Sequence, residues 1–397
     1  METAIEADTA EAGAMEWVRL LAEEVGPRRP TGAGERRAAE LVAAGLAKRG
    51  LSPEQRSFSG YPTFALPYGF ALAVALAGLP IARRRPLAAA ALAAAGAALT
   101  SAEDGLVNRP LTRAFARHAS QNVAATIEPH GGAGRTACLV CHLDASRSGV
   151  MFDRRFLPFL HAWIAAQAAA FGVAVAAPLW RRRRWGRRAL AAGYGVLIGG
   201  LALLSERELR GNDVPGANDN ASGVAAVITL ALELHANPLQ ETRVICLFTG
   251  CEEAGVLGAD AFVQELEADP ATADWRTWSF INFDGVAAPA TLRFLRREGV
   301  LRKWHADDHL TRIASEISSR RPELGLHGTD RNAGLTYDAT PVMARGGRAI
   351  TFSTQDGTIP NYHSMTDIVE NLDAGALSRA VEVGREMLAA IDRGEAD

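Results

Sequence analysis

The uneven spread of charge along this chain constrains its fold more than any other feature. Residues 57–82 and 86–102 carry no charged side chain, and arginines fill the gap between them at 83–85. The pattern recurs at 156–180 and 189–205, which are separated by arginines at 181–184, 187 and 188. Each block therefore predicts an apolar helix, a short basic tip and a second apolar helix.

The length of these segments is close to that of a bilayer span, which needs roughly 20 apolar residues. We therefore expect two membrane-embedded hairpins, with residues 58–102 and 156–205 in contact with the lipid bilayer. The segment after Pro86 is mostly alanine, which is only weakly apolar. A soluble insertion of alanine-rich helices stays open as the alternative.

The arginines give an expected orientation, because basic loops are enriched on the cytoplasmic side of membranes. The sequence thus predicts an integral protein of the cell membrane, with cytoplasmic tips and an extracytoplasmic polar part. Two observations weigh against an extracytoplasmic polar part: the N-terminal segment is acidic, and it does not resemble a signal peptide. The absence of an evident disulfide framework would also suit a cytoplasmic domain.

Without the two blocks, the chain alternates strand-like and helix-like segments. Short apolar runs at 121–127, 137–141, 243–248, 279–283 and 348–352 are typical of buried strands, and helical patterns occupy 34–49, 222–236 and 258–268. This alternation predicts an α/β three-layer sandwich with a mostly parallel central sheet. We expect one domain from residues 1–57, 117–152 and 206–397, interrupted by hairpin insertions at 58–116 and 153–205.

Overall composition excludes several classes of protein. Apolar residues make up 48% of the 397 positions, which excludes wholesale disorder. A net charge of −3 gives no reason to expect a nucleic-acid partner. The chain has only four cysteines, too few for a small disulfide scaffold. Cys138, Cys141 and Cys246 are expected to be buried small hydrophobes, and Cys251 is a weaker candidate for a site residue. The sequence leaves the oligomeric state open.

Acidic residues and histidines follow the predicted strands, at the sheet edge where α/β proteins place their ligand sites. The residues that gather there are His142, Asp144, Asp219, Glu252, Glu253, Asp284 and His363. Such a donor set suits one or two zinc ions, and a two-metal site also needs a bridging carboxylate and a base that is not a ligand. The tandem Glu252–Glu253 can supply one ligand and one base. Taken alone, each acid could equally be a cap or a turn residue, as Asp219 before a helix illustrates.

Five motifs in this order resemble those of the co-catalytic di-zinc aminopeptidases, metallopeptidase family twenty-eight, of the bacterial leucyl aminopeptidase and aminopeptidase Y type. The motifs are CHLD (141–144), GANDNASGVAA (216–226), FTGCEEAGVLGA (248–259), NFDGV (282–286) and YHSMTD (362–367). The resemblance extends to residues 25–46 and covers nearly all of the polar part. It covers none of the apolar blocks.

The resemblance implies a role for each motif residue and two Zn²⁺ ions per chain. It makes Asp219 the bridging carboxylate and Glu252 the general base. The other ligands that it implies are His142 and Asp284 on one ion and Glu253 and His363 on the other, with Asp144 orienting His142. The implied activity is hydrolysis of peptide bonds by a metal-activated water, with a peptide as the substrate and aminopeptidase action as the expected specificity.

This sequence departs from the family pattern at two points. His142 and Asp219 lie 77 positions apart because the second hairpin is inserted between them, and the two insertions are expected to meet as a four-helix bundle. The tyrosine that some members use to hold the developing oxyanion has only Tyr337 and Tyr362 as candidates. Two other functions stay open: a glutaminyl cyclase-like acyltransferase with one zinc, and a membrane assembly protein with a vestigial peptidase domain.

Overall fold

The computed structural model describes residues 13–180, 182–330 and 335–396, and it is built on one large mixed sheet. The strand order is β1-β2-β4-β3-β5-β10-β6-β9, and a separate pair is formed by β7 and β8. The strands are β1 (Glu54–Gly60), β2 (His118–Ile127), β3 (Arg135–His142), β4 (Thr242–Thr249), β5 (Ser279–Phe283), β6 (Leu292–Leu295), β7 (Arg297–Glu298), β8 (Trp304–His305), β9 (Leu326–Thr329) and β10 (Arg348–Thr354).

The centre of the sheet is parallel, as the strand–helix alternation predicts. Strands β4, β3, β5 and β10 run parallel to one another, whereas β1, β2 and β6 pair antiparallel with their inner neighbours. Every residue of β5 is buried, which a strand covered by helices on both faces requires. The expected α/β fold with a mostly parallel sheet is confirmed.

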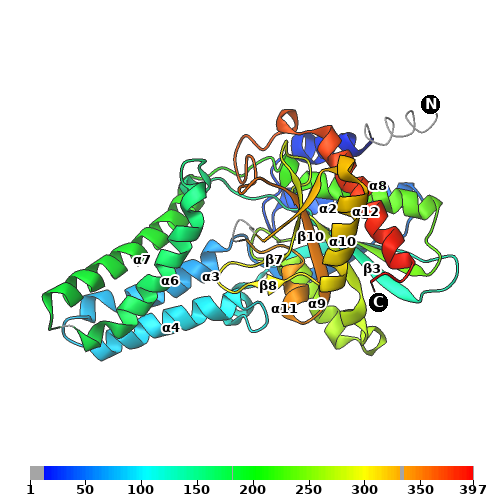
Figure 1. The fold of residues 1–397 in the computed structure, drawn as a ribbon. Helices are drawn as coiled ribbons and strands as arrows, with labels where there is room; N and C mark the ends of the chain where they lie inside the picture. Colours follow the sequence, from blue (N-terminus) through cyan, green and yellow to red (C-terminus); the bar gives the residue numbers. More distant parts are fainter. Residues whose placement is uncertain (1–12, 181, 331–334, 397) are drawn as a thin grey trace.

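Helices cover both faces of this sheet (Figure 1). On one face lie α8 (Gly223–Ala236) and α12 (Ala374–Asp392), which contact β3 and β5, and α10 (Asp308–Arg320), which contacts β9 and β10. On the other, α9 (Leu257–Ala268) and α11 (Thr340–Ala344) pack on each other and on β2 and β10. Helix α2 (Ala33–Lys48) contacts β1 and β2.

Aromatic side chains of β5 show how the layers are held. Phe283 stacks on Phe352 of β10, with ring centroids 5.8 Å apart. Phe280 contacts the rings of Trp275 and Trp278. Because residues three apart on a strand point to opposite faces, Phe280 and Phe283 pack on opposite sides of the sheet within one core cluster.

Four helices form a bundle that projects from the α/β part (Figure 1). They are α3 (Ala65–Leu76), α4 (Pro86–Asp104), α6 (Leu160–Ala176) and α7 (Arg184–Arg210), and the short α5 (Pro110–Phe115) leads back to β2. Helices α3 and α6 each contact both α4 and α7, so the four helices close into the expected bundle. The bundle has an apolar core of its own, which includes Leu72, Phe171 and Leu197.

The limits of the apolar helices differ from the expected ones. Residues 58–60 continue strand β1, because they pair with β2, and α7 runs on to Arg210. Three helices, at Pro86–Asp104, Leu157–Leu179 and Arg184–Arg210, are long and apolar enough to cross a membrane by length and composition, whereas the Ala65–Ile81 segment is shorter. The bundle also leaves large apolar side chains exposed, among them Phe70, Leu87 and Ile198.

Candidate metal centre

All seven residues predicted for the site lie together at the carboxyl edge of the parallel strands. His142 is the last residue of β3 and Asp284 directly follows β5, so strand register alone places these two side by side. The potential metal donors form two groups, each with its ligand atoms within 4.8 Å of one another: His142, Asp219 and Asp284, and Asp219, Glu253 and His363.

Asp219 belongs to both groups and turns one carboxylate oxygen to each. Its Oδ1 lies 3.2 Å from Nε2 of His142, and its Oδ2 lies 3.3 Å from Nε2 of His363. Asp284 approaches the same nitrogen of His142 to 3.4 Å, and Glu253 approaches that of His363 to 3.1 Å. The Asp219 carboxylate therefore lies between two similar donor groups, each of which adds one imidazole and one further carboxylate.

The loop that carries Asp219 is held from two directions. The carboxylate of Asp367 accepts hydrogen bonds from the backbone N–H of Asn218, at 2.7 Å, and of Asp219, at 3.1 Å. On the other side, the Asn220 amide donates to the carbonyl of Phe283 at 2.9 Å and accepts from Gly285 N–H at 3.2 Å. These bonds attach the Asp219 loop to the end of β5 and so fix Asp219 relative to Asp284.

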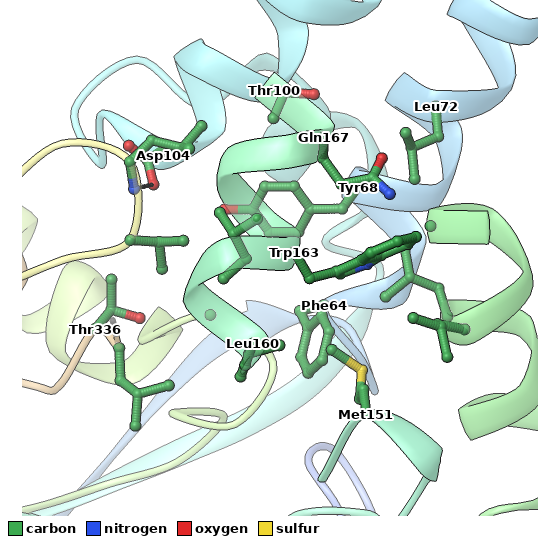
Figure 2. A pocket seen from close by; sticks show the side chains of 18 of the residues that line it. Phe64, Tyr68, Leu72, Thr100, Asp104, Met151, Leu160, Trp163, Gln167 and Thr336 are labelled. Atoms are coloured by element: carbon green, nitrogen blue, oxygen red, sulfur yellow. Dashed lines mark hydrogen bonds between the residues drawn. The ribbon is translucent and has the colours of Figure 1, made fainter. Parts of the chain in front are cut away.

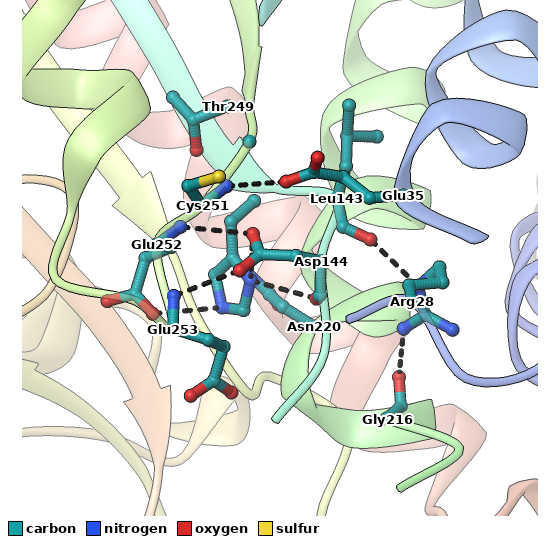
Figure 3. A network of polar contacts seen from close by, with 12 residues as sticks. Arg28, Glu35, Leu143, Asp144, Gly216, Asn220, Thr249, Cys251, Glu252 and Glu253 are labelled. Atoms are coloured by element: carbon teal, nitrogen blue, oxygen red, sulfur yellow. Dashed lines mark hydrogen bonds and ion pairs between the residues drawn. The ribbon is translucent and has the colours of Figure 1, made fainter. Parts of the chain in front are cut away.

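Asp144 binds the backbone of both glutamates (Figure 3) and also contacts His142. Its carboxylate accepts hydrogen bonds from the backbone N–H groups of Glu252, at 3.1 Å, and Glu253, at 3.0 Å. Nδ1 of His142 lies 3.1 Å from the Asp144 carbonyl oxygen and 3.5 Å from its Oδ1. With Nδ1 occupied in this way, Nε2 of His142 is the nitrogen that faces Asp219 and Asp284.

Glu252 stands apart from both donor groups. Its Oε2 lies 3.9 Å from Nε2 of His142, close enough to reach a group bound there but outside either cluster of ligand atoms. Burial raises the pKa of Glu252 well above its usual value, with the neighbouring His142 acting in the opposite direction. Cys251, just before it, has a left-handed backbone with φ of 54°, a strained conformation of the kind that gathers at functional sites.

The clustered carboxylates and imidazoles of the centre shift one another's pKa values. Burial would raise the pKa of Asp219, but the imidazoles of His142 and His363, at 3.2 and 3.3 Å, outweigh it and hold that pKa below its usual range. Burial raises the pKa of Asp284 to about 6. Burial lowers the pKa of His363, but Glu253 and Asp219 outweigh it and raise that pKa to about 9. The crowded carboxylates thus favour positive charge at this place in the fold, which a divalent cation would supply.

Unpaired atoms support the same conclusion. Among the described residues, Nε2 of His142 and Oε1 of Glu253 are buried without a hydrogen-bond partner. A buried polar atom without a partner costs about 1–3 kcal/mol, so native structures seldom keep one without a ligand or water to satisfy it. Two imidazoles and three carboxylates are a donor set that zinc and related divalent ions take.

Two supporting residues could not be assigned from the sequence. Arg28 is fully buried, and its guanidinium donates to the carbonyls of Leu143, at 2.8 Å, and Gly216, at 2.7 Å, which joins the β3 end to the Asp219 loop. Glu35 accepts hydrogen bonds from Cys251 N–H at 2.7 Å and from Ser120 Oγ at 2.9 Å. The only signal for Arg28 is a cation in a segment rich in proline and glycine. Glu35 looks like an ordinary acid in the first turn of α2.

The two candidate tyrosines occupy different places. Tyr362 stacks on the His363 ring with centroids 3.7 Å apart. Tyr337 is buried, and its hydroxyl has no hydrogen-bond partner in the described part of the chain. The four cysteines are all buried and unbonded, as expected for three of them, and Cys251 lies in a small apolar cluster with Tyr61 and Leu257 beneath the site.

Sequence comparison identifies the family that the motifs resemble. Residues 204–388 match Peptidase family M28. A probable lipoprotein aminopeptidase of Mycobacterium tuberculosis, LpqL, is 27% identical over a 187-residue alignment that covers 41% of this chain and 37% of that protein. Leupeptin-inactivating enzyme 1 of Streptomyces exfoliatus is 27% identical over 41% of this chain and 39% of its own length. The chain thus spans about two fifths of each relative, and the expected family resemblance is confirmed.

Solved structures show the same fold. An aminopeptidase from Aneurinibacillus sp. strain AM-1 superposes with a TM-score of 0.57 at 14% identity, over 96% of this chain and 93% of that one. A zinc aminopeptidase from Bacillus subtilis gives a TM-score of 0.57 at 16% identity, over 96% and 94%. A glutaminyl cyclase from Bacteroides thetaiotaomicron gives 0.53 at 14% identity, over 95% and 96%. At these identities the likeness establishes the fold alone.

Proposed function

We propose that this chain, whose residues 204–388 belong to Peptidase family M28, is a zinc-dependent aminopeptidase that binds two Zn²⁺ ions. The observation that carries the proposal is the division of the Asp219 carboxylate between two pockets. His142 and Asp284 complete one pocket, and Glu253 and His363 complete the other. A carboxylate that bridges two ions about 3.5–4 Å apart needs this arrangement.

Bound zinc would lower the pKa of a water molecule and polarise the scissile carbonyl. Glu252 lies beside the centre without belonging to either donor group, so its carboxylate is free to take a proton from the attacking water. It then returns that proton to the leaving amine, as a general base that becomes a general acid. Asp144 holds His142 with Nε2 facing the centre, and Asp367 fixes the loop of Asp219.

The Glu252→Gln variant tests this assignment. It keeps the shape of the side chain and every proposed ligand but removes the basic oxygen. Zinc content should stay at the wild-type value while turnover of L-leucine p-nitroanilide falls by about 10²–10⁴-fold, the usual contribution of a general base. Glu128→Gln on the exposed surface is the control and should change neither. Turnover that survives in Glu252→Gln would reject Glu252 as the base.

The second candidate activity is cyclisation of N-terminal glutamine, which the Bacteroides neighbour of the same fold illustrates by its name. Two complete donor groups favour the peptidase, because the cyclase alternative uses one zinc. Incubating the protein with a glutaminyl peptide separates the activities. Free glutamine in the products supports the aminopeptidase, and pyroglutamyl peptide in its place supports the cyclase.

We also propose that the bundle anchors the chain in the cell membrane. Its apolar helices and its exposed apolar side chains support this. The exposed arginines 83–85 lie between α3 and α4, and the exposed arginines 182–184 lie at the start of α7, both at the end of the bundle away from the sheet. Positive loops at one end place that end in the cytoplasm and the metal centre outside.

Cysteine labelling tests the side of the membrane. The four native cysteines are buried, so an Arg84→Cys variant adds one accessible thiol at the tip. In intact cells, a membrane-impermeant maleimide should leave this thiol unlabelled and should label it once the cells are opened. Labelling in intact cells would place the tips outside and reverse the topology.

A further inference from the structure

A cavity of about 280 Å³ extends from the metal centre into the four-helix bundle. At one end it is lined by Glu252, Glu253 and His363, and at the other by bundle residues such as Leu72 and Phe171. Its size is close to the lower end of ordinary small-molecule sites, roughly 300–1,000 Å³. The hollow of the bundle and the proposed reaction site are thus one space.

Each bundle helix turns a defined face to this cavity (Figure 2). The residues of α6 that line it are Leu160, Trp163, Ile164, Gln167, Ala168 and Phe171. Their spacing of three and four positions is that of a single helical face. Phe64 and Leu72, eight positions apart on the α3 side, follow the same rule. The cavity is therefore built from consistent faces of the inserted helices and is walled mainly by apolar side chains.

Several polar groups on the bundle wall are hydrogen-bonded within the protein itself. The Thr100 hydroxyl donates to the Gly96 carbonyl at 3.0 Å. The Gln167 amide nitrogen donates to the Val196 carbonyl at 2.7 Å. The Asp104 carboxylate accepts from backbone N–H groups of the 301–302 loop, at 3.0 and 2.7 Å. The polar groups that remain for a ligand are few: Oε1 of Gln167, which has no partner among the described residues, and the polar tips of Tyr68 and Trp163.

A mainly apolar wall accepts an alkyl chain more readily than a polypeptide backbone. Every residue of a bound peptide brings an N–H and a C=O that must find partners when buried. An alkyl chain brings none, and each methylene that it buries is worth roughly 0.8 kcal/mol. The bundle thus suits a hydrocarbon chain and is a poor host for polypeptide backbone.

We infer that the substrate is an amphiphile: an amide whose long alkyl chain occupies the bundle cavity while its scissile bond lies at the metal centre. This inference rests on the proposed function and names its substrate class. The apolar outer surface of the same helices gives such a molecule a source, because amphiphiles partition into bilayers. The class is a lipid-modified peptide or aminoacyl amide, in which the chain is longer than any natural amino-acid side chain.

Two substrate series test this, with the protein in phosphatidylcholine nanodiscs and rates referred to free aqueous substrate. One series lengthens the acyl side: p-nitroanilides of alanine, norvaline, norleucine and α-aminooctanoic acid. The other lengthens the amine side: ethyl, butyl, hexyl and octyl amides of L-alanine. In one of the two series kcat/KM should rise about fourfold per added methylene, which corresponds to ~0.8 kcal/mol per CH₂, until the chain fills the cavity.

Two adjacent exposed alanines of α6 provide matched variants. Ala168 lines the cavity and Ala169 does not. Ala168→Phe should lower the ratio of long-chain to short-chain kcat/KM by at least tenfold, and Ala169→Phe should keep the wild-type ratio. Binding of radiolabelled decan-1-ol to the zinc-stripped protein gives a readout without catalysis, and it should weaken in Ala168→Phe alone.

The outcomes separate this inference from the proposed function. Zinc-dependent turnover of alanine p-nitroanilide with no gain in either series, and no difference between the two variants, overturns the inference and leaves the peptidase intact. Decanol binding that depends on Ala168, without turnover of any amide, overturns the peptidase proposal and with it the substrate class. A chain-length gain that Ala168→Phe removes supports both.

Discussion

Replacing Asp144 by asparagine tests how the protein positions its proposed metal ligands. The carboxylate accepts two backbone N–H bonds, from Glu252 at 3.1 Å and Glu253 at 3.0 Å, and faces His142 Nδ1 at 3.5 Å. Asparagine has the same shape but only one acceptor oxygen. Its NH₂ group must therefore point at one of these donors.

The expected loss of zinc affinity in Asp144→Asn follows from these contacts. A hydrogen bond to a charged group contributes about 1.5–3 kcal/mol, and at 1.4 kcal/mol per factor of ten that is roughly 10–150-fold in an equilibrium constant. Losing such a bond loosens the loop that carries Glu252 and Glu253 and weakens the orientation of His142. We expect zinc affinity and kcat/KM to fall by about 10–100-fold, the usual effect of losing an outer-shell partner.

Chelator competition measures the zinc affinity, and p-nitroanilide hydrolysis at saturating zinc measures the remaining activity. Asp307→Asn is the matched control, because Asp307 also accepts two backbone N–H bonds, from His309 and Leu310. Asp307 caps α10, and its own N–H donates to Ala349, at the start of β10 and away from the site. Zinc affinity that is unchanged in Asp144→Asn, or reduced equally in both variants, would refute the positioning role.

Three further predictions concern protons, the core and the Asp219 loop. Zinc binds neutral imidazole and the pKa of His363 is raised to about 9 without metal, so zinc binding at pH 7 should release protons and its affinity should rise with pH until about 9; calorimetry in buffers of different ionisation enthalpy checks this, and a buffer-independent heat would contradict it. Phe283→Ala should cost about 3–5 kcal/mol of unfolding free energy, measured by denaturant titration, and a cost below 1 would contradict the packing described. Asp367→Ala removes both acceptors that hold the Asp219 loop, so chelator competition should show weaker zinc binding while α/β secondary structure persists in circular dichroism; wild-type affinity would count against that role.

The sequence could predict the parts of the site that depend on strand register. His142 and Asp284 sit at the ends of buried apolar runs, and parallel strands bring their ends to one edge. The family motifs then pointed to Asp219, Glu253 and His363, and the structure brings all three to the same edge. Their ligand roles remain proposals.

Contacts between side chains and distant backbone could not be predicted in this way. Asp367 binds the Asp219 loop across 148 positions, and Arg28 reaches Gly216 across 188. Such bonds depend on how loops approach one another in three dimensions, for which local periodicity carries no signal. The first apolar helix was expected, but α3 starts later than the uncharged run does, because residues 58–60 pair with β2 and belong to the sheet.

The Asp219 carboxylate lies between two donor groups, and we propose that two metal ions share it. Anomalous diffraction at the zinc edge, on crystals of the zinc-loaded protein, tests it directly. We expect two peaks on either side of Asp219, one beside His142 and Asp284 and the other beside Glu253 and His363. A single peak that Asp219 does not touch, or no peak at all, would contradict it.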